Sequence, residues 1–389
     1  MTAGEARAEP MRLHCTARGE VIPFAPGPVV TMYTCGITPY DATHLGHAAT
    51  YLTYDVLQRR LRDRGHETRC VRNITDVDDD ILRKARDLGV HYLDLAAAET
   101  ARFDDDMRAL GVLPVWSEPR ATSAIPDIRG FIGMVLDRGH AYEAGGGVYF
   151  DVSSFERFGQ LSHLSRDEML RLAAERGGNI DDPHKRDPLD FVLWQPSAPD
   201  EPSWESLWGP GRPGWHIECS ALALRELGTT IDLHGGGSDL IFPHHECEAA
   251  QSEAATGELF VRHWMHQAMV RMDGEKMSKS LGNLVFVSEL RKAWDTRAIR
   301  LAVLAHHYRQ EWEWDDEVMP DASHRLKRWL AAAGGEGTGA PGGVLEAVRA
   351  ALDDDLDTPR ALGLLDDAAD AGHGVTAGAA LLGVDLTRP

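Results

Sequence analysis

One stretch of this chain, residues 32–50, constrains the fold more than any other because it joins the pattern of a strand to the pattern of a helix start. A strand-like run at 29–33 is followed by a glycine turn, by His44 and His47, and by a helical segment. Backbone N–H groups and the helix dipole favour anions at a helix N-terminus. The stretch therefore predicts a phosphate site, although a chance pair of surface histidines explains the tetrapeptide taken alone.

The residues after this stretch predict a strand–helix–strand unit. Apolar side chains recur near the 3.6-residue helical period between about 48 and 64, and Gly65 ends the pattern. Residues 70–74 have the pattern of a second strand, so we expect a right-handed βαβ unit of a nucleotide-binding α/β sheet. Ligands bind such sheets at the carboxyl ends of the strands, which is where residues 75–79 would lie.

The rest of the chain predicts additions to this α/β core. We expect mainly helix from about 80 to 135, an irregular segment at 153–213, a return to the parallel sheet at 231–234, and helix again at 295–330. The predicted organisation is an N-terminal extension (1–28), a catalytic domain (29–290) with an insertion at about 95–213, a helical region (291–333), a linker (334–343) and a small C-terminal helical segment (344–389).

Composition limits the function. The net charge of −21 argues against a protein that holds a long nucleic acid across its general surface. The five cysteines are scattered and form no CxxC, so a disulfide framework is not expected. No secretory segment follows Met1, and no apolar run approaches the roughly 18 residues of a membrane span. We therefore expect a soluble, cytoplasmic monomer that contacts no membrane.

Four residues form a candidate metal site. Cys35, Cys219 and His244 offer thiolate and imidazole ligands, which suit Zn²⁺, and a catalytic zinc keeps one position open beyond three protein ligands. Glu248 lies four residues after His244 on the same helical face, as a fourth ligand or as a solvated carboxylate. Buried structural cysteines and capping histidines are the alternative interpretation.

The segment 276–280 is a candidate phosphate-binding loop. It places Lys276 and Lys279 beside two serines, just before Gly282. Lysines in such a loop neutralise the charge that develops during a phosphoryl or nucleotidyl transfer. An exposed basic loop with no ligand is the commoner explanation of two lysines at this spacing.

Taken together, the motifs resemble a known family. HLGH at 44–47 and KMSKS at 276–280 are similar to the HIGH and KMSKS motifs of class I aminoacyl-tRNA synthetases. The similarity to the cysteinyl branch extends from about 31 to 329 and is carried by residues 35–36, 73–79, 187–190, 214–219 and 242–246. Two relatives fit this pattern. One is cysteinyl-tRNA synthetase, and the other is the mycothiol-pathway ligase family, which joins cysteine to glucosaminyl-inositol with ATP.

Several segments favour the ligase family over the synthetase. Residues 35–50 and 311–316 resemble the ligase, and ERGGNI at 175–180 is similar to its ERGGDP motif but departs at the last two positions. Residues 301–389 contain seven Lys and Arg against sixteen Asp and Glu, which suits an anticodon stem poorly. Glu248 and residues 251–253 look more like the synthetase, whose fourth zinc ligand falls at Glu248.

The resemblance implies a Rossmann-like class I synthetase catalytic domain with a parallel sheet, followed by a C-terminal helical bundle. It implies one Zn²⁺ held by Cys35, Cys219 and His244, with the substrate thiolate in the open position, and ATP as a substrate together with Mg²⁺. The implied catalytic residues, which stabilise the phosphates, are His44, His47, Lys276 and Lys279. The residues implied to surround cysteine and its adenylate are Cys35, Gly36, Ile37, Thr38, Thr50, Asn73, Ile74, Thr75, Trp215, Gly237, Ser238, Asp239 and Val270.

The implied reaction is an ATP-dependent ligation. Cysteine forms an adenylate with release of pyrophosphate, and the amine of glucosaminyl-inositol then attacks it to give an amide and AMP. The partners are these small molecules, and tRNA is not expected. A cysteinyl-tRNA synthetase, or a shortened paralogue that activates cysteine for another acceptor, is the alternative. Residues 175–179 are a candidate contact for the sugar.

Overall fold

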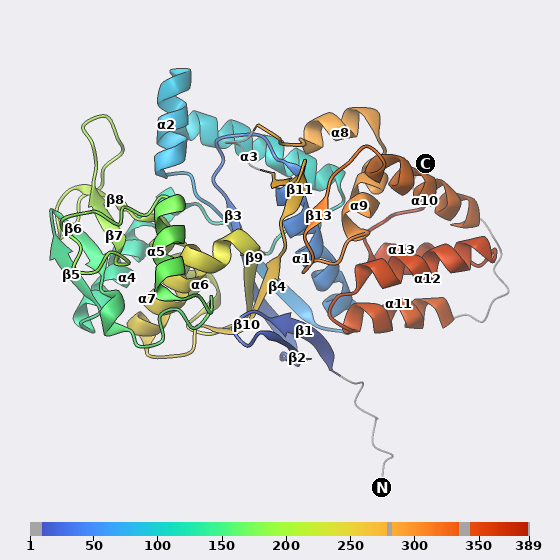
Figure 1. Ribbon diagram of the computed structural model, residues 1–389, viewed down its shortest axis with the longest axis horizontal. Coiled ribbons are helices and arrows are strands. Elements are labelled where there is room, and N and C mark those ends of the chain that lie inside the picture. The colour runs from blue at the N-terminus through green and yellow to red at the C-terminus, as the bar shows by residue number, and fades with distance from the viewer. Residues whose placement is uncertain (1–9, 278–281, 334–342, 388–389) are drawn as a thin grey trace, which may run out of the picture.

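The computed structural model describes residues 10–277, 282–333 and 343–387. Lys279 and residues 334–342 of the expected linker lie outside the described residues. Figure 1 shows a central sheet with a lobe of strands and helices on one side and a group of helices, which includes the C-terminal segment, on the other.

A four-stranded parallel sheet forms the centre, in the order β10-β9-β3-β4. Its strands are β3 (Val29–Ile37), β4 (Glu67–Ile74), β9 (Ile231–Gly237) and β10 (Val261–Gln267), and α1 (Leu45–Asp63) connects β3 to β4. The predicted parallel strand–helix–strand unit is thus confirmed, as is the α/β fold class. Strand β10 was not predicted, because its polar sequence VRHWMHQ does not resemble a strand that is buried on both faces.

The two faces of the sheet pack against different parts of the chain. Side chains alternate along a strand, so Met32 joins the core formed with α1 and the C-terminal helices, whereas Tyr33 and Cys35 join the core on the opposite face. That second core includes α4 (Ile125–Asp137), α6 (Trp215–Leu227) and α7 (Glu246–Thr256). The alternation decides which helices Cys35 faces.

Helix α1 begins three residues earlier than its apolar pattern predicts. His44 is the N-cap, and its Nδ1 accepts a hydrogen bond of 3.1 Å from the backbone N–H of Gly46. A side chain that accepts from a first-turn N–H supplies the partner that this donor lacks within the helix. At the other end Gly65 adopts a φ of 91°, which an L side chain disfavours, and the helix ends there as predicted.

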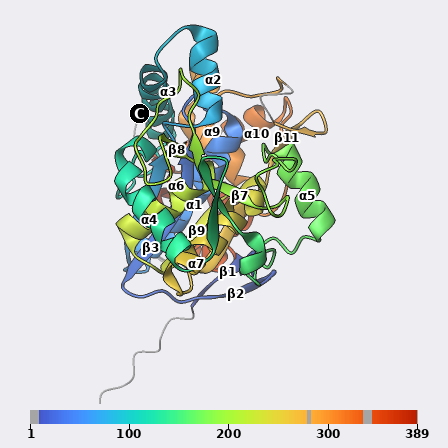
Figure 2. The same cartoon turned by 90° about the vertical axis from the view of Figure 1, so that its left-hand side faces the viewer.

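The segment from 79 to 213 is more regular than predicted. Its helices are α2 (Asp79–Leu88), α3 (Tyr92–Ala109), η1 (Ala121–Ala124), α4, η2 (Val152–Ser154) and α5 (Arg166–Glu175), and its strands are β5 (Ala141–Ala144), β6 (Gly147–Phe150), β7 (Phe191–Pro196) and β8 (Gly211–Pro213). These strands form an antiparallel sheet in the order β5-β6-β7-β8, seen at the front of Figure 2. The expectation that 153–213 is irregular is therefore wrong for α5, β7 and β8 and holds for the turns and loops between them. The apolar run of β7 pairs with β6, which lies about forty residues earlier.

Both ends of the described chain contain regular structure. Residues 11–24, expected to be part of an irregular start, form an antiparallel hairpin of β1 (Met11–Cys15) and β2 (Glu20–Phe24).

The remaining elements are η3 (Ser238–Leu240), η4 (Ile241–His245), β11 (Val270–Met272), β12 (Glu275–Lys276), α8 (Val287–Ala293), α9 (Thr296–Leu304), β13 (Trp312–Glu313), α10 (Val318–Ala333), α11 (Gly343–Asp353), α12 (Thr358–Asp370) and α13 (Thr376–Leu381). None of the helices in the described residues is long and apolar enough to span a membrane.

Candidate active site and metal centre

A cavity of about 1440 Å³ opens at the carboxyl ends of β3 and β9. Its walls come from the end of β3, the start of α1, the start of α2, the segment after α5 and the short helices η3 and η4. This is the edge of a parallel sheet at which ligands bind in open α/β folds. The insertion sheet contributes to the opposite wall through Tyr149, Phe191 and Gln195.

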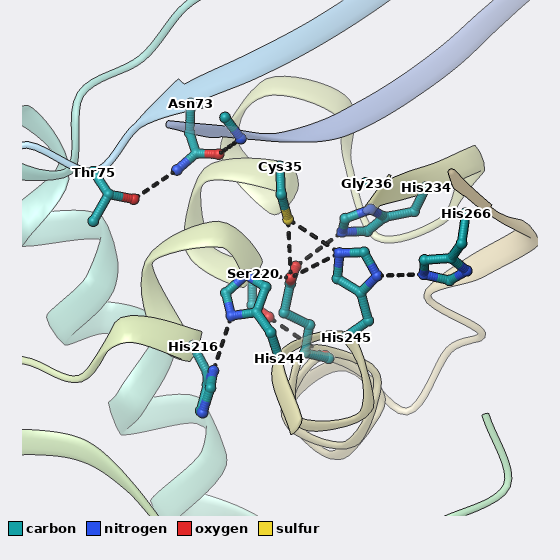
Figure 3. Close-up of polar contacts among 12 residues, drawn as sticks. Cys35, Asn73, Thr75, His216, Ser220, His234, Gly236, His244, His245 and His266 are labelled. Carbon is teal, nitrogen blue, oxygen red and sulfur yellow. Dashed lines mark hydrogen bonds and ion pairs between the residues drawn. The ribbon is translucent and has the colours of Figure 1, made fainter. Parts of the chain in front are cut away.

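A compact group of four buried side chains stands beside this cavity. Cys35 comes from β3, Cys219 from α6, His244 from η4 and Glu248 from α7, and one ligand atom of each lies within 4.8 Å of the others. Figure 3 shows Cys35 and His244 converging on the same point. Two sulfur atoms, one nitrogen and one oxygen form a donor set that suits Zn²⁺. The structure therefore brings together all four residues that the sequence proposed as ligands.

Hydrogen bonds hold Glu248 at the centre of this group. Its Oε1 lies 2.9 Å from His244 Nε2 and 3.5 Å from Cys35 Sγ, and its Oε2 lies 2.9 Å from His234 Nε2. Burial opposes ionisation, but His234 and His244 lower the pKa of Glu248 below its ordinary value. A carboxylate that stays charged at 0% exposure is poised to bind a cation. Of the two alternatives for Glu248, the solvated carboxylate is therefore wrong, whereas its role as a fourth ligand stays a prediction.

Burial and the contacts within the group also shift the pKa values of Cys219, Cys35 and His244. A hydrogen bond with Cys35 lowers the pKa of Cys219 to about 6, whereas burial raises the pKa of the Cys35 thiol well above its ordinary value. Although burial disfavours an imidazolium, Glu248 and Cys219 raise the pKa of His244 to about 10. Cys219 and Glu248 thus ionise in a dry site beside a protonated His244, and a bound cation would take the place of that proton.

A second group overlaps the first and was missed by the sequence reasoning. It consists of Cys35, His234, His245 and Glu248. Cys35 Sγ lies 3.2 Å from His245 Nε2, and His245 Nδ1 lies 2.7 Å from Nε2 of His266, as Figure 3 shows. These histidines sit on β9, β10 and η4 with no metal-binding spacing in the sequence. Only the pairing of β9 with β10 brings His234 and His266 to the same edge.

The residues proposed to surround the amino acid occupy two layers. Those that line the cavity are Cys35, Gly36, Ile37, Thr38, Thr50, Trp215, Gly237, Asp239 and Val270. Asn73 and Thr75 are buried behind them: Asn73 Oδ1 accepts 2.8 Å from the N–H of Gly36, and its Nδ2 donates 3.1 Å to Thr75 Oγ1. Ile74 is buried in β4, and Ser238 lies in η3 without lining the cavity.

The two histidines of the HLGH segment also line the cavity. The rings of His44 and His47 stack with their centroids 3.8 Å apart. Across the cavity, Met277 lines the wall, and its N–H donates 3.0 Å to the carbonyl of Val270. Lys276 lies in β12, next to Met277, whereas Lys279 lies outside the described residues. The start of the KMSKS segment is thus close to the proposed adenine contact, Val270.

Arg176 explains part of the ERGGNI segment. Its guanidinium donates to the backbone carbonyl oxygens of Asp239 and Phe242, which lie in η3 and η4. Glu175 is exposed and pairs with Arg171. Arg176 therefore ties the segment after α5 to the segment that carries Asp239 and leads to His244.

Comparisons with known proteins agree with this geometry. The family described as "tRNA synthetases class I (C) catalytic domain" matches residues 24–324. The chain is 49% identical, over 97% of its length and 96% of the relative's, to the "L-cysteine:1D-myo-inositol 2-amino-2-deoxy-alpha-D-glucopyranoside ligase" of Streptosporangium roseum. It is 52% identical, with the same coverage, to the protein of that name from Nakamurella multipartita.

Among solved structures, the fold is similar to methionyl-tRNA synthetase of Mycobacterium tuberculosis in complex with methionyl-adenylate. The TM-score is 0.65 at 16% sequence identity, and the match covers 92% of this chain and 88% of the other. This likeness concerns the fold.

Proposed function

The chain belongs to the family of L-cysteine:1D-myo-inositol 2-amino-2-deoxy-alpha-D-glucopyranoside ligases, built on a class I (C) synthetase catalytic domain, and we propose that it ligates L-cysteine to the amine of glucosaminyl-inositol. ATP is cleaved to AMP and pyrophosphate in this reaction. One observation carries the proposal: a buried group of potential metal ligands, two of them thiols, stands beside the cavity that His44 and His47 line.

Selection of cysteine would depend on the metal group. Cys35, Cys219 and His244 would hold Zn²⁺, with Glu248 close enough to be a fourth ligand. When bound, the metal supplies a soft acceptor for the substrate thiolate, which the hard hydroxyl of serine does not match. The donor set fits this ion, because two thiols, an imidazole and a carboxylate are all buried and lie close to one another.

Activation of cysteine would take place in the cavity, against the residues that line it. The carboxylate of cysteine attacks the α-phosphorus of ATP, and pyrophosphate leaves. His44, His47, Lys276 and Lys279 would stabilise the charge on the phosphates, together with Mg²⁺. Thr38, Thr50, Trp215 and the 237–239 segment would hold the amino acid, while Asn73 and Thr75 keep Gly36 in place. Val270 would line the adenine side.

The second step would join the two substrates directly. The acceptor nitrogen attacks the carbonyl carbon of the cysteinyl adenylate, an amide forms, and AMP departs. No residue of the chain needs to form a covalent bond with the substrate. We place the reaction in the cytoplasm, because ATP is available there and thiols such as the five free cysteines stay reduced.

Purified protein tests the proposal. With ATP and cysteine it should exchange pyrophosphate into ATP, and adding glucosaminyl-inositol should release AMP and a cysteine amide in equal amounts. Charging of tRNA with cysteine, with no response to the sugar, would instead identify a synthetase. Absence of cysteine-dependent exchange would contradict both enzymes and favour a binding module.

A further inference from the structure

Three consecutive aspartates stand where α2 begins, and each has a different environment. Asp79 pairs with Arg212, a buried residue of β8, and Asp80 pairs with Arg83. Asp78 is the N-cap, and its Oδ1 accepts 2.7 Å from the N–H of Asp80. Among the described residues, Asp78 forms no ion pair, and its Oδ2 has no hydrogen-bond partner. Asp78 is thus the one acid of the three that forms no ion pair in this part of the structure.

Asp78 lines the catalytic cavity together with Ile37, Thr38 and Trp215. It lies four residues beyond the end of β4. The backbone N–H of Thr75, just before it, donates 3.0 Å to the carbonyl of Ile37, which fixes this segment to the end of β3. Asp78 therefore lines the same cavity as the residues proposed to hold the cysteinyl group, on a segment anchored to the end of β3.

A second, independent feature lies close to Asp78, in the first turn of α6. Glu218 is 1% exposed, and its Oε2 has no hydrogen-bond partner within the described part of the chain. The other contact of its carboxylate is the side chain of Thr75, and the carboxylates of Asp78 and Asp76 face it closely enough to act on it. A buried oxygen without a hydrogen-bond partner is unfavourable, so a ligand is expected to supply one. Several carboxylates with a shortage of donors suit an ammonium group.

We propose that Asp78 binds the ammonium group of the acceptor and removes the proton that the nitrogen must lose before it attacks the cysteinyl adenylate. This assignment rests on the proposed function. It makes Asp78 a catalytic residue of the amide-forming step alone, because the adenylate forms before the acceptor takes part.

The step balances in atoms and charge. One proton passes from the ammonium nitrogen to the Asp78 carboxylate, which frees the nitrogen lone pair. That pair forms the C–N bond to the adenylate carbonyl, and the C–O bond to phosphate breaks with its electrons leaving on AMP. The second nitrogen proton is lost as the amide forms and goes to the departing phosphate oxygen. Asp78 then returns its proton to water.

The electrostatics of Asp78 suit this role. Burial, with the nearby charges of Asp80 and Asp79, raises the pKa of Asp78 to about 6, while the Asp80 N–H and Arg212 act in the opposite direction. Tyr40 and Arg83 face the same acids through Asp80, and Glu218 faces Asp78 from α6. A base with a pKa just below neutral is mostly ionised at pH 7 and still accepts a proton readily.

The Asp78→Asn variant tests the assignment, because asparagine caps a helix as well as aspartate does and leaves the fold intact. Asp87→Asn, an exposed position on the same helix outside the cavity, is the matched control. We expect Asp78→Asn to keep cysteine-dependent ATP–pyrophosphate exchange within about twofold of wild type and to form the amide at least about 100-fold more slowly in single turnovers, the usual contribution of a general base. The control should match wild type in both assays.

Two further measurements distinguish a catalytic role of Asp78 from a structural one. Hydroxylamine, an amine already unprotonated at neutral pH, should capture the cysteinyl adenylate equally well in wild type and in Asp78→Asn. In wild type the amide-forming rate should fall as pH drops below about 6, and the variant should lack this fall. Equal loss of exchange and of amide formation, or unchanged amide formation, would overturn the role of Asp78. Failure of wild type to form any amide would overturn the proposed function, and the role of Asp78 with it.

Discussion

Cys35 reaches the metal-binding group because side chains alternate along β3. Met32 packs toward α1, and Cys35, three residues on, points to the opposite face, where Cys219 and His244 arrive from other elements. The thiol of Cys219 has a pKa of about 6, owing to its hydrogen bond with Cys35, so it ionises readily when a cation binds.

The first prediction concerns Cys219. Cys219→Ala removes one of the sulfur donors and should release the bound zinc, which metal analysis of the purified variant would measure. Cys70→Ala, another buried cysteine that belongs to neither metal-binding group, should keep its zinc. Full retention of zinc in Cys219→Ala would contradict this site.

Gly36 allows the ends of β3 and β4 to lie close together. A Cβ at this position would lie 1.5 Å from the backbone oxygen of Asn73, so the two strand ends approach only because no side chain intervenes. Gly36→Ala should destabilise the fold by about 1–3 kcal/mol or more, the usual cost of overpacking. It should also raise the KM for cysteine, because Asn73 must move.

Thermal unfolding and steady-state kinetics would measure both effects of Gly36→Ala. Gly27→Ala is the matched control, since a Cβ there meets nothing within 4 Å. A Gly36→Ala variant with wild-type stability and wild-type KM would show that the close approach does not matter for the site.

Sequence reasoning succeeded for residues whose spacing carries information and failed for those that pairing alone brings together. Cys35, Cys219, His244 and Glu248 were proposed as ligands from motifs, and the structure brings them together, although their roles stay predictions. His234 and His266 escaped notice, because neither belongs to a motif with ligand spacing, and only the pairing of β9 with β10 places both beside His245.

At the scale of elements, the same contrast holds. The βαβ unit was predictable because local sequence patterns are enough to identify α1 and β4. The antiparallel sheet of the insertion was not, because β8 has three residues and β7 finds its partner far away in the sequence. The division of the chain into domains stays a prediction, since the described C-terminal helices share one core with α1.

Arg176 acts between elements, and the third prediction concerns it. It donates to two carbonyl oxygens of the η3–η4 segment, and hydrogen bonds from charged groups contribute about 1.5–3 kcal/mol each. Arg176→Met should therefore loosen Asp239 and raise the KM for cysteine by about tenfold or more, given about 1.4 kcal/mol per factor of ten. Arg176→Lys, which keeps a single donor, should lose less.

Arg171→Met is the control for Arg176, because Arg171 lies on the exposed side of α5 and contacts Glu175. Its KM for cysteine should equal that of wild type. Steady-state kinetics at saturating ATP would decide, and an Arg176→Met variant with an unchanged KM would rule out the positioning role.

At the scale of the whole molecule, charge separates the two candidate acceptors. The chain carries a net charge of −21, and its last 89 residues hold seven basic and sixteen acidic side chains. In α11 and α12 many of the acids are already paired, such as Asp353 with Arg60 and Asp366 with Arg325. Four arginines of the C-terminal segment, Arg309, Arg325, Arg328 and Arg349, are ion-paired with carboxylates and offer little to nucleic-acid phosphates.

The last prediction follows from this distribution. A tRNA anticodon arm presents closely spaced phosphates, and proteins that bind it release counterions, so their affinity falls steeply with salt. For this chain we expect no saturable binding of tRNA specific for cysteine at about 0.1 M salt, where charges more than about 10 Å apart are screened. Filter binding across a salt series would measure it, with a cysteinyl-tRNA synthetase as the positive control. Tight, salt-dependent binding together with charging would show that the acidic C-terminal helices do not exclude tRNA. It would favour cysteinyl-tRNA synthetase over the ligase as the function of this chain.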